Sequence, residues 1–415
     1  MTTNDALVLL VLAAGVFLAP PISARLGVPS AVGEIVYGAI IAALVPGLSR
    51  LPAFVTFVEH FGFLLVLFLA GLELDTHALF ANGPGRLLRA LPFAVAVPVG
   101  SMLIAALLGY APVLGLIVGT ISIGLTARVL ADLSLLRTPI GQAAIVTGGL
   151  GEVITIVCLT ILEEGTHGFS ALRLLSAGAR LVLLFGAGFV VLALLRDLAW
   201  WRPSWFSRLL QENDPSELGL RSALALLSAF AAIAALLSVP DVLAAFVAGL
   251  ALGVIFPVRE TENTQSTAAP LRARLAAIGL GFFVPIAFIT VGQHLDLHAL
   301  TKPGPLALGA GILAASGLVR FLALPILRLQ AGWEDATLIA LVLSEPLTLK
   351  VTVAELSVSV HALPAATLTP AVAASTAGAI IFPTLFRLML QRRDVRRAAA
   401  EPRNPTLAAD GRAGG

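Results

Sequence analysis

The sequence predicts an all-α polytopic membrane protein with about 13 transmembrane helices, arranged as an inverted-topology repeat with two crossing broken helices. The first reason is composition: 58% of the 415 residues are hydrophobic, 12% are charged, and the mean hydropathy is +0.97. Soluble proteins of this size are much less apolar. The second reason is that the apolar runs are continuous, whereas strands of a membrane barrel alternate over about ten residues. The third is a pair of matching segments in the two halves of the chain.

Apolar runs between charged residues, Pro and Gly define the predicted spans. They cover residues 5–22, 30–46, 57–73, 88–109, 113–131, 141–162, 170–195, 218–238, 241–256, 276–292, 304–328, 336–360 and 364–391. No Lys or Arg precedes the first run, so we expect it to be a span and not a cleaved signal peptide. Residues 1–391 therefore form one transmembrane domain. Residues 392–415, which lack a periodic apolar face, are expected to be a disordered basic cytoplasmic tail.

The distribution of basic residues predicts how the chain crosses the membrane. With the N-terminus outside, almost every loop arginine lies in the cytoplasm, and only Arg50 and Lys302 face outwards. Since short cytoplasmic loops carry the excess of Lys and Arg, we expect an odd number of spans and a cytoplasmic C-terminus. We expect this multi-pass protein in the lipid bilayer of the plasma membrane.

Composition and motifs also exclude several classes of function. The single cysteine, Cys158, excludes a disulfide framework and a cysteine zinc site. A net charge of +2 gives no support for a nucleic-acid partner. The sequence has no Ser-His-Asp set, metal-binding cluster or glycine-rich phosphate loop, so we expect neither an enzyme nor a bound cofactor.

An internal repeat is indicated by the ends of the third and tenth spans. Residues 71–79 (GLELDTHAL) match residues 292–300 (GQHLDLHAL) at the Gly, Leu, Asp, His, Ala and Leu positions. The two spans are seven positions apart in order, an odd number, so the two segments run in opposite directions through the bilayer, as in the inverted repeats of secondary transporters. The first six spans would pair with the last six, and the seventh would connect them. Chance recurrence of such endings in Leu-rich sequence is the alternative.

Charged residues within the spans are the main candidates for a functional site, because each costs about 2.5–3.5 kcal/mol at the membrane centre. Glu152 lies near the middle of span 141–162, where it either carries a proton or cation or is a neutral structural carboxylate. Arg320 is expected to be a structural counter-charge. Lys350 and Glu355 share one span and are candidates for a local ion pair. Glu34 is either functional or interfacial.

Two spans are expected to be interrupted. Pro346 removes a backbone donor and frees carbonyl groups in span 336–360. The repeat relates this span to 113–131, where Ser122 and Thr126 offer hydroxyl groups beside the flexible Gly124. Two facing broken helices would present opposite dipole ends and free carbonyls to an ion. An ordinary proline kink is the alternative.

Four stretches of the sequence resemble the monovalent cation:proton antiporter family, in its branch of bacterial sodium/proton and potassium/proton exchangers. They are residues 33–47 (GEIVYGAIIAALVPG), 63–75 (FLLVLFLAGLELD), 122–141 (SIGLTARVLADLSLLRTPIG) and 282–296 (FFVPIAFITVGQHLD). The resemblance extends over nearly the whole membrane part, from about residue 30 to residue 390. It implies a dimerisation domain and a separate core domain, and therefore a homodimer.

The resemblance also implies the site residues. The family's paired acidic motif falls on Gly151-Glu152, so the ion-carrying carboxylate is kept at Glu152 and the first acidic side chain is absent. We expect Ser122 and Thr126 to contribute to the same ion and proton site, with Arg320 as the counter-charge to Glu152. A substitution of Gly151 by Asp is expected to add a second titrating group. The family's Arg-Gly-Glu stretch is replaced around Pro346, Leu347 and Thr348, and we assign Pro346, Thr348 and Lys350 supporting roles.

The sequence thus favours an antiporter that exchanges Na⁺ or K⁺ for protons. One carboxylate that trades one proton for one monovalent cation moves no net charge, so electroneutral exchange is expected. Two alternatives remain at this point. One is a transporter of the same fold that moves another solute, anchored by Arg320 or Lys350; the other is a non-transporting membrane sensor.

Overall fold

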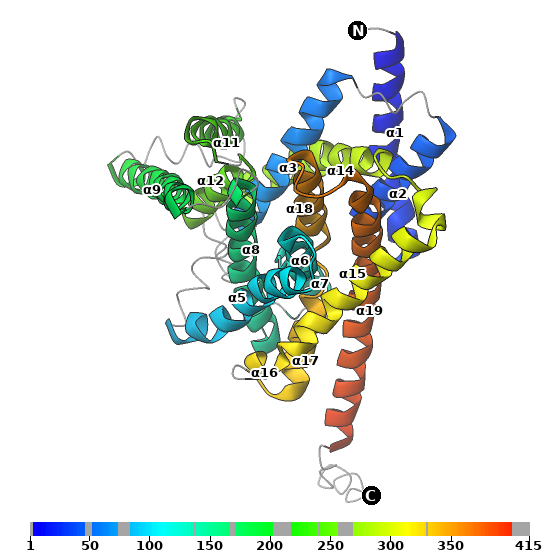
Figure 1. Cartoon of the computed structure of the whole chain (residues 1–415). Coiled ribbons are helices and arrows are strands. Elements are labelled where there is room, and N and C mark those ends of the chain that lie inside the picture. Colours follow the sequence, from blue (N-terminus) through cyan, green and yellow to red (C-terminus); the bar gives the residue numbers. More distant parts are fainter. Residues whose placement is uncertain are drawn as a thin grey trace, which may run out of the picture.

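Every regular element in the described part of the chain is a helix, as the computed structural model in Figure 1 shows. The structure describes residues 3–45, 52–73, 84–133, 135, 138–165, 171–201, 217–239, 241–255, 269–328 and 331–400. Eight helices are long and apolar enough to cross a membrane, and a bent helix pair forms a ninth candidate span. Four shorter apolar helices, at Ser30–Leu44, Pro112–Thr126, Gly178–Leu194 and Asp241–Gly253, overlap further predicted spans.

The helices pack in two groups. The first, the scaffold, is made of α1 (Thr3–Leu26), α2 (Ser30–Leu44), α3 (Ala53–Glu73), α11 (Leu218–Leu237), α12 (Asp241–Ile255), α13 (Ala269–Ile278) and α14 (Val284–Gln293). A π-helical turn, η2 (Gly279–Phe283), joins α13 to α14 in one continuous span. The long α9 (Ala171–Trp201) packs on α11 and α12 and also contacts the second group.

The second group, the core, contains the interrupted helices. It is made of α5 (Pro84–Leu107), α6 (Pro112–Gly119), α7 (Gly124–Asp132), α8 (Pro139–Gly165), α15 (Pro303–Leu322), α16 (Leu324–Leu327), α17 (Trp333–Val342), α18 (Leu347–Ser359) and α19 (Leu368–Ala400). Two short 3₁₀ turns, η3 (Ala299–Thr301) and η4 (Ala365–Thr367), precede α15 and α19. The scaffold meets the core where α18 contacts α3 and where α8 contacts α12.

Glycines let the scaffold helices cross at backbone contact. Helix α2 crosses α14, and α3 crosses α12, with a glycine at each contact where an added Cβ would overlap a carbonyl oxygen of the partner helix. The four contacts are Gly71 on Phe246, Gly249 on Phe68, Gly292 on Ile35 and Gly38 on Ile289. Close approach of this kind is typical of membrane helices. In lipid the hydrophobic effect does not drive helices together, and small residues allow the close van der Waals packing that does.

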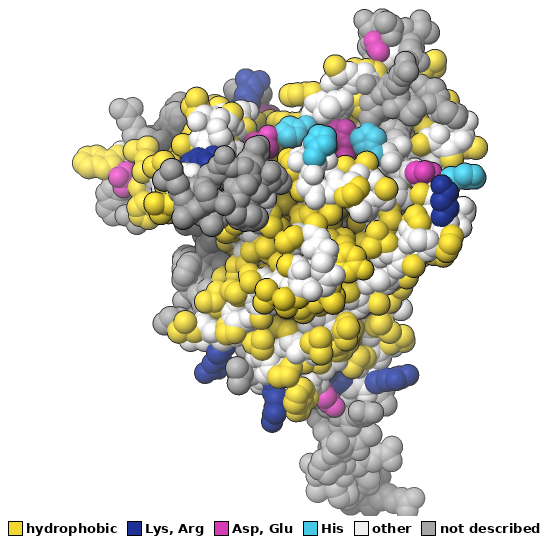
Figure 2. All heavy atoms as spheres, in the orientation of Figure 1, with side chains coloured by type: hydrophobic (Ala, Val, Ile, Leu, Met, Phe, Trp, Pro, Cys, Tyr) yellow, Lys and Arg dark blue, Asp and Glu magenta, His cyan; other side chains and the backbone are white. Residues whose placement is uncertain are grey.

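The surface fits a membrane environment. Figure 2 shows hydrophobic side chains over the middle of the visible face, with charged side chains at the upper and lower edges of this band. Exposed apolar side chains on the helices include Phe17, Leu107, Phe189 and Leu236. Exposed apolar side chains of this size fit contact with the hydrocarbon of a lipid bilayer.

The predicted basic tail is partly helical. Helix α19 continues to Ala400, so residues 392–400 are not the disordered segment that the sequence suggested. The reason is that α19 packs on its neighbours beyond the apolar stretch, where Arg393 Nη1 lies 3.0 Å from Asp335 Oδ1 on α17. Residues 401–415 and the loop around Arg50 lie outside the described residues, as does most of the matching segment after Glu73.

Candidate functional site

Both predicted interruptions are present. Residues 120–123 separate α6 from α7, and residues 343–346 separate α17 from α18, with a bend of 50° between the latter two. Pro346 is the residue directly before α18, so it lies at the start of a new helix segment and does not kink a continuous helix. The peptide groups at such breaks lack partners within their helix and need them elsewhere.

The two breaks face each other. Thr126 Oγ1, on α7, donates a hydrogen bond to the carbonyl oxygen of Val342 at the end of α17 (3.0 Å) and lies 3.2 Å from Ser122 O. A Cβ added to Gly124 would lie 3.7 Å from Thr348 Oγ1 on α18. The first turns of α7 and α18 therefore lie side by side at the crossing.

Glu152 lies next to the break between α6 and α7. Its side chain projects from α8 and is 1% exposed, and Oε2 accepts a hydrogen bond from Ile123 N at 3.0 Å. One turn further along α8, Thr155 Oγ1 accepts a hydrogen bond from Ile121 N at 3.2 Å. Thr155 was missed by the sequence reasoning, although its spacing of three residues from Glu152 placed both on one helix face.

Arg320, which was expected to be a structural counter-charge, lies at the helix breaks and donates to backbone carbonyl groups. The fully buried guanidinium donates to Leu343 O (2.9 Å), Val118 O (3.0 Å), Ser316 O (2.6 Å) and Thr120 O. Three of these carbonyls lie at the C-terminal ends of α6 and α17, which carry partial negative charge. The positive charge of Arg320 therefore compensates two helix ends.

Lys350 pairs with Glu345, and the predicted pair with Glu355 is wrong. Lys350 Nζ lies 2.8 Å from Glu345 Oε2 and donates to Ser316 Oγ at 3.0 Å. Both side chains are buried. The direct contact offsets the free-energy cost of removing the two charges from water. Glu355 points to the other side of α18, where it lies 3.5 Å from the imidazole of His294.

Gly151 has no free space for a second acidic side chain. A Cβ at this position would lie 2.6 Å from Cβ of Ile121, closer than real Cβ contacts. The sequence suggested that the first acidic position had merely lost its side chain. In the structure, the Ile121 side chain occupies the place that this side chain would need.

A cavity of about 90 Å³ lies between the scaffold and the core beside this crossing. From the scaffold it is lined by residues of α2, α3 and α14, including Glu34, and from the core by Ser122, Gly124 and Thr348. Glu34 is 3% exposed and lines this cavity. Glu152 is not among the lining residues, but its carboxylate bonds to Ile123, between Ser122 and Gly124.

These features define a class of protein. Two interrupted helices that cross next to a buried carboxylate, beside a cavity between two helix groups, form the architecture of a secondary transporter. Residues 11–392 match the family model described as sodium/hydrogen exchanger, transmembrane, and the chain belongs to this family.

Relatives and a solved structure agree with this assignment. The chain is 26% identical over 287 residues to the Na⁺/H⁺-K⁺ antiporter GerN of Bacillus cereus, covering 68% of this chain and 70% of GerN. It is 25% identical over 399 residues to YjbQ of Bacillus subtilis, covering 89% of this chain but 60% of that protein. The solved structure of the sodium proton antiporter MjNhaP1 from Methanocaldococcus jannaschii has the same fold, with a TM-score of 0.56 and 15% identity over 92% of this chain and 95% of that chain.

Proposed function

We propose that this protein exchanges a monovalent cation, Na⁺ or K⁺, for protons across the plasma membrane, with Glu152 as the carrier. The observation that carries the proposal is the position of Glu152, a buried carboxylate hydrogen-bonded to the backbone at the break of α6 and α7. Membership of the sodium/hydrogen exchanger family supports it.

Exchange follows from competition for one carboxylate. A cation enters the cavity past Glu34 and reaches Ser122, which lines the cavity. A small movement of residues 122–124 would open Glu152, whose proton leaves as the cation binds to carboxylate and hydroxyl oxygens from Glu152, Ser122 and Thr126. Monovalent cations bind to such oxygen ligands, and proton and cation cannot occupy the carboxylate together.

Two buried positive charges near the site already have partners. Lys350 pairs with Glu345, and Arg320 offsets the C-terminal ends of α6 and α17. With both of these cations partnered, the exchange of one proton for one monovalent cation at Glu152 moves no net charge, which favours electroneutral exchange.

We further propose 13 spans related by an inverted repeat. Support comes from the glycine contacts of the scaffold. Gly71 contacts Phe246 and Leu250, whereas Gly292 contacts Ile35 and Ala39, so the equivalent glycines meet residues with the same spacing in α12 and α2. An inverted repeat in which α3 corresponds to α14 and α12 corresponds to α2 relates the two contacts. We place the homodimer interface on the scaffold, because the resemblance to the antiporter family implies a dimerisation domain separate from the core.

Proteoliposomes with an imposed pH gradient test the function. Addition of Na⁺ or K⁺ should dissipate the gradient with the wild-type protein, and Glu152→Gln, which keeps the size and hydrogen-bonding groups, should abolish this response. Glu334→Gln, a change of an exposed carboxylate on α17, is the matched control and should transport normally. Wild-type rates in Glu152→Gln would disprove the role of Glu152. A wild-type protein that responds to no monovalent cation would favour the transport of another solute or a sensor function.

A further inference from the structure

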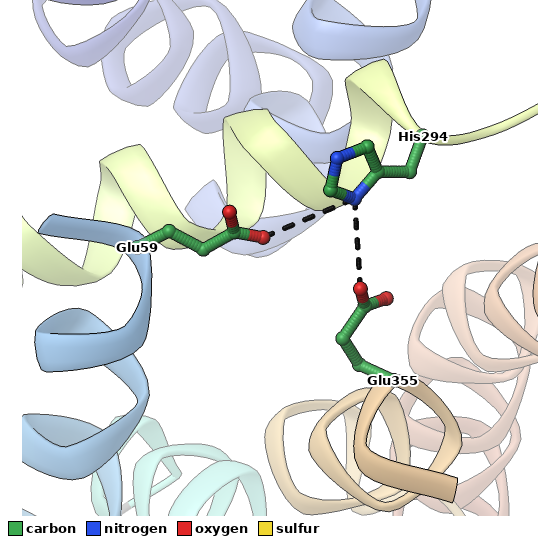
Figure 3. A group of neighbouring side chains, drawn as sticks. All are labelled: Glu59, His294 and Glu355. Atoms are coloured by element: carbon green, nitrogen blue, oxygen red, sulfur yellow. Dashed lines mark ion pairs between the residues drawn. The ribbon is translucent and has the colours of Figure 1, made fainter. Parts of the chain in front are cut away.

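A second group of ionisable side chains lies at the same interface between scaffold and core, away from the site described above. Figure 3 shows Glu59 on α3, His294 at the end of α14 and Glu355 on α18, with both carboxylates directed toward the same imidazole nitrogen, Nδ1 of His294. His294 Nδ1 lies 3.5 Å from Glu355 Oε1 and 3.9 Å from Glu59 Oε1. One ligand atom from each residue lies within 4.8 Å of the other two.

The cluster is partly shielded from solvent but still accessible. The side chain of Glu59 is 10% exposed, that of Glu355 is 22% exposed, and that of His294 is 38% exposed. The second oxygen of Glu355, Oε2, is buried and has no hydrogen-bond partner in the described part of the protein. The ligand atoms of Glu59 and Glu355 lie within 4.8 Å of each other, and one Glu355 oxygen has no partner among the described residues. Two carboxylates placed in this way attract a cation.

The cluster lies at the opposite end of the interface from the cavity. On α3, cavity residue Val66 is about two helical turns from Glu59, and on α18, Thr348 is about two turns from Glu355. The same order holds for α14, where Phe288 lines the cavity and His294 follows the last turn. The cavity therefore lies toward one end of the interface between scaffold and core, and the cluster lies toward the other end.

We propose that Glu59, His294 and Glu355 form a binding site for a zinc ion that ties the scaffold to the core. One imidazole nitrogen with two carboxylate oxygens is a donor set that zinc accepts, whereas magnesium and calcium favour oxygen ligands alone. Ligands of a tetrahedral zinc ion lie about 3.3–3.5 Å apart, given bond lengths of about 2.0–2.2 Å. The distances of 3.5 and 3.9 Å approach this geometry, and a water molecule would complete it.

The neighbouring histidine is engaged outside the cluster. His60, next to Glu59 in the sequence, has its Nε2 2.6 Å from Asp241 Oδ2 and is already paired.

The Glu355 carboxylate raises the pKa of the His294 imidazole, although burial lowers it. Binding is therefore measured at pH 8, where protons compete less with zinc for the nitrogen than at neutral pH.

The three ligands come from both helix groups, so a bound zinc ion affects exchange. This inference rests on the function proposed above. Glu59 and His294 belong to the scaffold, whereas Glu355 belongs to the core. Exchange requires the core to move relative to the scaffold, so an ion bound to all three residues holds the two groups together. Zinc added on the side where α14 ends then inhibits exchange.

Calorimetric titration of the purified protein with ZnCl₂ in detergent at pH 8 tests the site without any need for transport. We expect one zinc ion per chain, affinity at least tenfold weaker in His294→Gln and Glu355→Gln, and wild-type affinity in His298→Gln. His298 is an exposed imidazole in the same connection and provides the matched control. Equal affinity in wild type and His294→Gln, or no binding to wild type, would overturn the proposal. Gel filtration and melting curves check that each variant is folded.

Exchange in proteoliposomes tests the inhibition separately. Zinc should slow exchange by the wild type and His298→Gln, and should have little effect on His294→Gln and Glu355→Gln. If zinc binds in the calorimeter but leaves wild-type exchange unchanged, the link between scaffold and core is wrong. If the wild type binds zinc but exchanges no cation, the exchange function fails and the zinc site stands.

Discussion

The side chain of Ile121 limits the size of the residue at position 151. Gly151 lies beside Ile121 of the first helix break, with an added Cβ only 2.6 Å from Cβ of Ile121. A larger residue must therefore push the backbone segment that donates hydrogen bonds to Glu152 and Thr155. A glycine here does more than omit a charge, because it allows α8 to approach the break closely.

We therefore expect Gly151→Asp to destabilise the protein instead of simply adding a titrating group. Overpacking of this kind costs about 1–3 kcal/mol, and the new carboxylate adds a burial cost. The measurement is the melting temperature in detergent, which should fall in Gly151→Asp and, to a smaller extent, in Gly151→Ala. Adding Ile121→Ala to Gly151→Ala should recover part of the loss. A Gly151→Asp protein as stable as the wild type would show that the break can move away at little cost.

Among the elements, α8 has a structural role in addition to carrying Glu152. Its residues Glu152 and Thr155 accept the backbone N–H groups of Ile123 and Ile121, which lack partners within a helix because α6 has ended. On the opposite side, Arg320 takes up the free carbonyl groups of α6 and α17. The interrupted helices are thus stabilised from both sides by neighbouring helices.

Two threonines of α8 allow this role to be tested. Thr155→Val removes the acceptor for Ile121 N with little change in shape and should cost about 1–3 kcal/mol, since a buried donor loses its partner. Thr147 is equally buried on the same helix, but its hydroxyl has no hydrogen-bond partner among the described residues. Thr147→Val should therefore be neutral or slightly stabilising. Melting curves of the two variants should separate, and equal curves would contradict the role of Thr155.

For the whole molecule, the balance of charge around Glu152 makes a kinetic prediction. If one proton is exchanged for one monovalent cation, the rate should change little when a potassium diffusion potential is imposed on proteoliposomes. Moving one net charge through 100 mV is worth about 2.3 kcal/mol, or about 50-fold in an equilibrium ratio. A strong response of the wild-type rate to the potential would show that a second group moves charge in each cycle. Glu34, in the cavity, would then be the first candidate.

The orientation in the membrane is a second prediction at this scale. With the N-terminus outside, the connection after α14 faces outwards and the connection after α16 faces the cytoplasm. Single cysteines in place of His298 and Arg328, both exposed, should be labelled from opposite sides in a Cys158→Ser background. Labelling from the same side would mean that the number of spans between them was miscounted. It would also change the side of the membrane assigned to the end of α14, where the proposed zinc ligand His294 lies.

The sequence by itself determined that this is a polytopic helical membrane protein of the sodium/hydrogen exchanger family, because hydropathy and motifs are local properties of the chain. It also located Glu152, Arg320 and the two helix breaks, since charges and a proline inside apolar runs stand out at once. Partners across the fold could not be read in the same way. The pairing of Lys350 with Glu345, the contact of Arg320 with two helix ends, and the closeness of Ile121 to Gly151 were decided by packing. The same is true of Glu59, His294 and Glu355, whose positions far apart in the sequence gave no ligand spacing. Such contacts depend on how helices cross, and the side of a helix that meets a distant neighbour is fixed only by the tertiary structure.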